Sequence, residues 1–188
     1  SINKTYLWKI KTKRLYKVEK NLALTGMMGV GKTTIGKRLA KKLNYDFIDV
    51  DKIIEKTEGQ SISSIFKNKG ENYFRKIEKE LTIIELKKNK SVISLGGGAF
   101  LDNSIRQCAK KNSVSFWLDV PFSTLFKRLK KSKNRPVLAK EKTKNSIKKI
   151  YFSRKNIYNH ANYRIKCKKL TLKQIVEKIL EYYEKSRN

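Results

Sequence analysis

The sequence predicts an α/β fold in which a five-stranded parallel sheet lies between two layers of helices. Three observations support this. Short apolar runs alternate with segments whose apolar residues recur at helical spacing. The alternation continues along the chain without a repeat or a linker. A glycine-rich turn joins the first strand to the first helix. Such alternation builds βαβ units, whose strands run parallel, and 188 residues suffice for one domain with a sizeable core.

The expected strands are short apolar runs bounded by glycines, charges or turn residues. They cover residues 22–25, 46–51, 91–95, 114–118 and 163–167. The first is apolar throughout, as a strand buried on both faces should be. The second ends in two carboxylates, and the third is followed directly by three glycines. We therefore expect polar and glycine residues at the carboxyl ends of neighbouring strands, where open α/β sheets bind ligands.

Helical spacing is clearest after the first strand, where Ile35 and Leu39 lie four residues apart. Gly59 and Gly70 should interrupt the helices that follow. Pro121 should open another, at a position where its missing N–H costs little. The expected helices cover residues 34–43, 52–58, 61–69, 71–88, 103–111, 121–129, 146–159 and 172–185.

Two segments do not fit this alternation. Residues 1–20 form a basic, aromatic-bearing N-terminal extension, and residues 21–188 form the single predicted domain. Within that domain, residues 130–144 are charged and contain little apolar material to bury. We expect this stretch to be a mobile lid.

The first strand leads into a complete phosphate-binding loop, or P-loop. Residues 26–33 read Gly-Met-Met-Gly-Val-Gly-Lys-Thr, which matches G-x-x-x-x-G-K-[ST]. The glycines let backbone N–H groups turn inward around a phosphate, and the following helix adds partial positive charge at its N-terminus. Lys32 should reach the β- and γ-phosphates, and the Thr33 hydroxyl should bind Mg²⁺. The residues expected to hold ATP here are Gly29, Val30, Gly31, Lys32, Thr33 and Thr34.

The carboxylates that follow the second strand are Asp49 and Asp51. On an extended chain, residues two apart point to the same side. One carboxylate could assist Mg²⁺ and the other could accept a hydrogen bond from a substrate hydroxyl. The alternative is that Asp51 only caps the next helix. The glycines at 96–98 would let a substrate lie against bare backbone, although a flexible turn would also use them.

Charge and composition limit the partners and the cellular location that the sequence predicts. The formal net charge is +30, yet the lysines are spread along the chain, so we expect weak, salt-sensitive attraction to polyanions and no specific nucleic-acid partner.

No apolar run approaches the roughly 20 residues of a membrane span, and no secretory signal is evident. Cys108 and Cys167 are expected to be buried, reduced thiols. These features favour a cytoplasmic protein, which we expect to be a monomer.

Most basic residues of this chain are lysines, so its few arginines indicate positions where the planar guanidinium is needed to bind a carboxylate or a phosphate. Arg75, Arg128, Arg135 and Arg154 are the candidates for binding.

Taken together, these motifs resemble the shikimate kinase family. The resemblance runs from about residue 22 to about residue 180. It includes the P-loop, the D-x-D at residues 49–51, the stretch from Gly59 to Glu78, the three glycines, the sequence Arg-Pro-Val-Leu at 135–138, and Arg154 with Tyr158. It implies transfer of the ATP γ-phosphoryl group to the 3-hydroxyl of shikimate, with Mg²⁺.

The resemblance also implies a role for each matching residue. Lys32, Asp51 and Arg135 would be catalytic, and Asp49 would join Thr33 at Mg²⁺. The shikimate site would consist of Asp51, Arg75, Gly97, Gly98 and Arg154. Arg128 would stack near the adenine, and Arg135 would close with the lid over the phosphates.

The chain departs from the family pattern at two points. Val50 stands where members often have Thr or Ser, and Ala161 follows Tyr158 by three residues rather than four. Two other readings stay open at this stage. One is another small-molecule kinase, such as a gluconate kinase. The other is a polyanion-binding module on a degenerate kinase fold.

Overall fold

The computed structural model describes residues 20–131 and 144–187. The predicted N-terminal extension, apart from Lys20, lies outside the described residues. So does most of the predicted lid, including Arg135. At the edges of that segment, Lys130 and Lys131 end one helix and Lys144 begins another.

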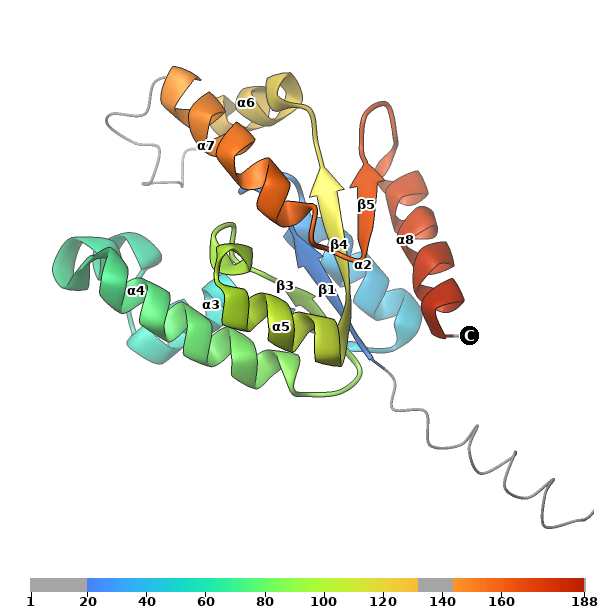
Figure 1. The fold of residues 1–188 in the computed structure, drawn as a ribbon, viewed down its shortest axis with the longest axis horizontal. Coiled ribbons are helices and arrows are strands. Elements are labelled where there is room, and N and C mark those ends of the chain that lie inside the picture. Colours follow the sequence, from blue (N-terminus) through green and yellow to red (C-terminus); the bar gives the residue numbers. More distant parts are fainter. Residues whose placement is uncertain (1–19, 132–143, 188) are drawn as a thin grey trace, which may run out of the picture.

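The predicted five-stranded parallel sheet is confirmed, with strand order β2-β3-β1-β4-β5 (Figure 1). The strands are β1 (Asn21–Thr25), β2 (Asp46–Asp49), β3 (Ser91–Ser94), β4 (Ser113–Asp119) and β5 (Tyr163–Lys166). All five residues of β1, the central strand, are buried. The chain runs from β1 outward to β2, returns to β3, and then crosses to β4 on the other side of β1. This reversal opens a crevice at the carboxyl end of β1.

Helices cover both faces of the sheet. They are α2 (Lys32–Leu43), α3 (Val50–Glu58), α4 (Ile62–Leu86), the short 3₁₀ helix η1 (Ala99–Leu101), α5 (Asn103–Asn112), α6 (Phe122–Lys131), α7 (Lys144–Tyr158) and α8 (Leu172–Arg187). Helices α2 and α8 pack together on one face, and α4, α5 and α7 lie on the other (Figure 1). Helix α2 sits so close to the sheet that a Cβ on Gly36 would collide with the Phe47 ring.

The structure corrects one element boundary. The second strand ends at Asp49 and α3 begins at Val50, so Asp51 lies in the first turn of a helix instead of on an extended strand. The Val50 side chain is fully buried at this junction. The break predicted at Gly70 is confirmed, because the helices predicted over 61–69 and 71–88 are the two arms of α4, which is kinked at that glycine. Gly70 separates them with φ 81° and ψ 172°, a backbone conformation that glycine alone adopts readily.

None of the helices in residues 20–131 and 144–187 is long and apolar enough to cross a membrane. Both cysteines are free thiols, and each is half-buried where full burial was expected. Burial raises the pKa of the Cys167 thiol to about 11, so it stays protonated at neutral pH.

Candidate active site

A cleft of about 770 Å³ opens at the carboxyl ends of the strands and gathers most of the predicted site residues. The predicted residues that line it are Gly29, Gly31, Lys32, Thr33, Thr34, Asp49, Asp51, Arg75, Gly97, Gly98 and Arg154. They come from β1, β2 and β3 with the segments that follow these strands, and from α4 and α7. The fold therefore brings distant parts of the chain to one site.

The P-loop has the geometry of an anion site. Gly29 and Gly31 hold φ values of 83° and 103°, a left-handed backbone region that favours glycine. Helix α2 begins at Lys32, so its free N–H groups face the cleft. The Lys32 ammonium folds back over its own loop and donates to the carbonyl oxygens of Gly26 at 2.8 Å and Met27 at 3.1 Å. The loop thus offers backbone donors and a cation at one point.

The Thr33 hydroxyl donates to Oδ2 of Asp49 at 2.8 Å, which links the P-loop to the end of β2. Asp49 occupies the N-cap position of α3 but makes no side-chain cap bond. Its carboxylate is turned toward the P-loop. A hydroxyl and a carboxylate side by side form the hard oxygen donor set that Mg²⁺ prefers, so these residues fit the predicted metal role.

Arg75 is held by two carboxylates of its own helix. Its Nη1 donates to Glu78 Oε2 at 2.7 Å, and its Nε and Nη2 donate to Glu71 Oε1 at 3.3 and 3.2 Å. Glu71 is exposed, whereas only 3% of the Glu78 side chain is accessible. The two acids orient the guanidinium toward the cleft. Sequence reasoning assigned neither acid a role, although carboxylates three and four residues from an arginine on a helix are a usable signal.

Gly96 lies between two carboxylates. A Cβ built on Gly96 would lie 2.5 Å from Glu78 Oε1 and 2.9 Å from Asp51 Oδ1. Burial raises the pKa of Glu78, and the nearby Asp51 charge adds to that rise, while Arg75 and Arg154 oppose it. The first glycine of the three therefore accommodates acids, which the sequence did not reveal.

Gly97 joins the α7 helix to the P-loop. Its carbonyl oxygen accepts hydrogen bonds from Arg154 Nη1 at 3.2 Å and from the buried Tyr158 hydroxyl at 2.5 Å. A Cβ on Gly97 would lie 3.2 Å from the backbone nitrogen of Met28, so the glycine segment and the P-loop are in close backbone contact. Arg154 also lines the cleft.

Gly98 lies close to the Arg75 guanidinium, and adding a methyl group at Gly98 would test whether this contact matters. A Cβ there would lie 2.9 Å from Cζ of Arg75, although the glycine's own backbone is in an ordinary region with φ −104° and ψ −10°. We expect Gly98→Ala to displace the guanidinium and raise about tenfold the KM for the carboxylate substrate that Arg75 is expected to bind, the cost of one perturbed charge-assisted contact. The unfolding midpoint should change little. Gly59→Ala is the control for a general loss of stability, because its φ of 65° strains the alanine while nothing lies within 4 Å of the added Cβ. An unchanged KM in Gly98→Ala would contradict this account.

The pKa of Glu78 gives a pH-dependent prediction. A carboxyl whose pKa is higher folded than unfolded adds stability below its ordinary value near 4.5, and this contribution is lost as pH rises through the folded pKa. We expect the difference in unfolding free energy between the unaltered protein and Glu78→Gln to fall as pH rises across that window. Urea unfolding at several pH values would measure it. Glu80→Gln, which removes an exposed carboxylate of the same helix, is the control. A difference that grows with pH would overturn the assignment.

Two predicted nucleotide contacts lie away from the cleft wall. The Val30 side chain is buried and faces a small cavity behind the P-loop. Arg128 of α6 donates from Nη1 to the Val30 carbonyl at 3.2 Å, which ties that helix to the loop. Arg135 lies outside the described residues.

The parallel sheet, the P-loop with its Thr–Asp pair, and the arginine-lined cleft beside it define a P-loop phosphotransferase that acts on a small molecule. Comparison with known proteins narrows this class. The family model for shikimate kinase matches residues 28–184, and the chain belongs to the shikimate kinase family.

Individual relatives agree with this membership. A protein from Thermodesulfovibrio yellowstonii named shikimate kinase is 41% identical over 169 residues, which is 90% of this chain and 98% of that protein. The solved structure of shikimate kinase from Acinetobacter baumannii in complex with shikimate matches with a TM-score of 0.84 at 29% identity. That match covers 92% of this chain and 97% of the other.

A gluconokinase structure from Sinorhizobium meliloti matches with a TM-score of 0.55 at 16% identity, over 90% of this chain and 94% of the other. A likeness at that level shows the shared fold alone. The shikimate kinase interpretation of the sequence is therefore supported over the gluconate kinase alternative.

Proposed function

We propose that the protein transfers the γ-phosphoryl group of ATP to the 3-hydroxyl of shikimate. One observation carries the proposal: the P-loop, Asp51 and two arginines, Arg75 and Arg154, line the same cleft. Shikimate has one carboxylate and three hydroxyls, and forked guanidinium groups suit a carboxylate. The relative from Acinetobacter baumannii, which is described in complex with shikimate, supports this choice of substrate.

At the nucleotide end, the P-loop amides from Gly29 to Thr34 bind the phosphates, and Lys32 adds positive charge where the γ-phosphoryl group leaves. Thr33 and Asp49 would hold Mg²⁺, which would supply positive charge to offset that of the phosphates. When ATP binds, Lys32 exchanges its bonds with the loop carbonyls for phosphate oxygens. The loop and the cation thereby stabilise the charge that develops in the transition state.

At the substrate end, Arg75 and Arg154 bind the carboxylate of shikimate, which lies against Gly97 and Gly98. Asp51 accepts a hydrogen bond from the attacking hydroxyl and aligns its oxygen with the γ-phosphorus. Glu71 and Glu78 fix the direction of the Arg75 guanidinium. Because phosphoryl transfer depends mainly on positioning and charge, Asp51 orients the hydroxyl as well as receiving its proton.

Four further parts of the proposal concern the adenine contact, the lid, the oligomeric state and the cellular compartment. Arg128 stacks near the adenine, and Arg135 acts with a lid at residues 130–144; both follow from family resemblance. The active form is a monomer, because one chain supplies both sides of the cleft. The site of action is the cytoplasm, in keeping with two free thiols.

A coupled assay that follows ADP release tests the proposal. With ATP and Mg²⁺, shikimate should support saturable turnover, whereas gluconate at the same concentrations should not. Lys32→Met, which keeps the side-chain stem but removes its charge, should abolish the signal and thereby exclude a contaminating kinase. Turnover with gluconate and none with shikimate would reject the proposed function.

A further inference from the structure

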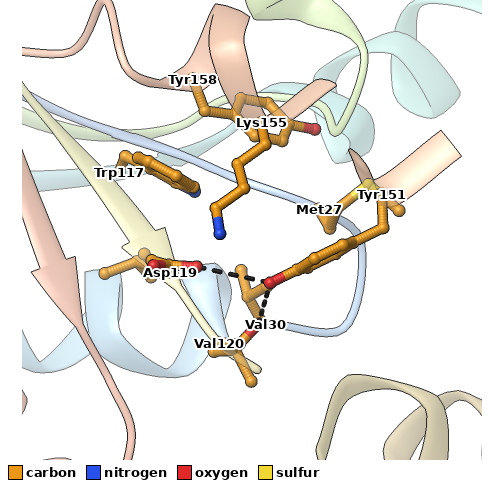
Figure 2. A pocket seen from close by; sticks show the side chains of 9 residues that line it. Met27, Val30, Trp117, Asp119, Val120, Tyr151, Lys155 and Tyr158 are labelled. Atoms are coloured by element: carbon orange, nitrogen blue, oxygen red, sulfur yellow. Dashed lines mark hydrogen bonds between the residues drawn. The ribbon is translucent and has the colours of Figure 1, made fainter. Parts of the chain in front are cut away.

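A second, much smaller cavity of about 10 Å³ lies behind the P-loop, and Met27 lines both this cavity and the cleft. Met27 and Val30 of the loop form one wall, the end of β4 forms another, and Tyr151 and Lys155 of α7 close it (Figure 2). Neither Lys155 nor the carboxylate that it faces was assigned a role above.

That carboxylate belongs to Asp119, the last residue of β4, and only 11% of its side chain is accessible. Both hydrogen bonds from Arg164, at 2.9 and 2.6 Å, go to Oδ2. From residues 20–131 and 144–187, the other oxygen, Oδ1, accepts one long bond of 3.5 Å, from the Tyr151 hydroxyl, which also lies 3.1 Å from the Val120 carbonyl as a donor. A carboxylate oxygen has two acceptor sites, so Oδ1 can take a further donor.

Lys155 supplies a donor that faces this carboxylate without bonding to it directly. Its ammonium points toward the Asp119 carboxylate, between Trp117 and Tyr151 (Figure 2). No hydrogen bond or ion pair joins Lys155 directly to another described residue. A half-buried ammonium needs polar partners. When two charged groups face each other across such a gap, a bridging water is the expected link.

The cavity suits one water. A volume of about 10 Å³ is close to the minimum that a single water occupies, and a buried water needs two to four polar partners. Lys155 Nζ, Asp119 Oδ1 and the Tyr151 hydroxyl provide three. We propose that Lys155 is a positioning residue, bridged through one water to Asp119, that fixes α7 against the end of β4.

The consequence for the cleft follows from helix geometry. Successive residues of a helix point about 100° apart. Arg154 therefore faces the cleft, where its Nη1 bonds to the Gly97 carbonyl at 3.2 Å, while Lys155 faces the cavity behind the loop. A bridge at Lys155 fixes the rotation of α7 and hence the direction of the Arg154 guanidinium. This inference rests on the proposed function, in which Arg154 binds the shikimate carboxylate.

The kinetic test uses Lys155→Met, which keeps the stem and removes the charge, beside Lys148→Met, which removes an exposed lysine of the same helix. Lys155→Met should raise KM for shikimate roughly five- to tenfold, the usual size of a coupling between residues in one network. The kcat and the KM for ATP should stay within about twofold. In an Asp119→Asn background, the effect of Lys155→Met should largely disappear.

Several results would overturn the proposal. These are a shikimate KM that is the same in the two lysine variants, an effect on KM for ATP alone, or full additivity with Asp119→Asn. A high-resolution crystal structure gives an independent readout, in which a water within hydrogen-bonding distance of Lys155 Nζ and Asp119 Oδ1 is expected. A Lys155 side chain directed into solvent would contradict the bridge. If the unaltered chain failed to phosphorylate shikimate, the proposed function would fall, but the crystal structure would still decide the bridge.

Discussion

Replacing Asp51 with Asn is expected to lower kcat/KM for shikimate on the order of 10²-fold or more, the scale of losing a general base. Asp51 lines the cleft with the P-loop, and its Oδ1 lies against Gly96, beside Glu78 and Arg75. Asn keeps the size of the side chain but cannot accept a proton from the attacking hydroxyl. The loss should appear mainly in kcat. The KM for ATP should change little, because Lys32 and the loop amides are unaltered.

The sequence also allowed Asp51 to act only as a helix cap, and the structure helps to separate that role from a catalytic one. Asp51 is the second residue of α3, whereas the cap position belongs to Asp49. A structural role would therefore be limited to the interaction of one charge with the helix N-terminus, about 0.3–1 kcal/mol of stability. Asp46→Asn, at the exposed start of β2, is the control for removing a negative charge nearby. If Asp51→Asn turned over shikimate at nearly the normal rate, the catalytic assignment would be rejected.

Arg75→Lys is expected to lower kcat/KM for shikimate on the order of 10- to 100-fold, chiefly through KM. The substitution keeps the positive charge but removes the planar fork. At present the fork bonds to Glu78 and Glu71 and leaves its remaining donor capacity for a substrate carboxylate. Lysine has donors on a single nitrogen and cannot satisfy all of these acceptors in the same geometry. The loss corresponds to hydrogen bonds to charged groups, worth about 1.5–3 kcal/mol.

A modified substrate tests whether the effect of Arg75→Lys arises from the substrate carboxylate. The methyl ester of shikimate lacks the negative charge that Arg75 would bind, so Arg75→Lys should affect turnover of the ester much less than turnover of shikimate. Arg38→Lys, on the exposed face of α2, should be neutral with both compounds. An equal effect of Arg75→Lys on shikimate and on its ester would show that Arg75 does not contact the carboxylate.

The sequence predicted the sheet and the P-loop well because both are local signals. A buried parallel strand is a short apolar run, and the P-loop needs its glycines and Lys32 in fixed order. The end of β2 was less predictable. Val50 reads as the continuation of an apolar strand, and its full burial is equally compatible with the first residue of a helix. Because the strand ends at Asp49 and the helix begins at Val50, Asp51 lies in a helix and not in the predicted strand.

The residues that sequence reasoning missed act through the tertiary structure. Glu78 resembles any solvated helix carboxylate until the fold places it beneath Gly96 and next to Arg75. Lys155 is one of many lysines in a chain of net charge +30, and only the packing of α7 against the end of β4 distinguishes it. The spacing of Glu78 from Arg75 is a local signal, but Gly96 lies 18 positions from Glu78 and Asp119 lies 36 positions from Lys155, and no local pattern predicts those two contacts.

The most direct test of the proposed function identifies the reaction product. The purified protein would be incubated with ATP, Mg²⁺ and shikimate, and the product analysed by proton–phosphorus correlation NMR. The proposed function predicts one new phosphate monoester, coupled to the proton at carbon 3 of shikimate, formed in equal amount with ADP and lost in Lys32→Met. Phosphate on another hydroxyl, or ADP formed with free phosphate and unmodified shikimate, would contradict it.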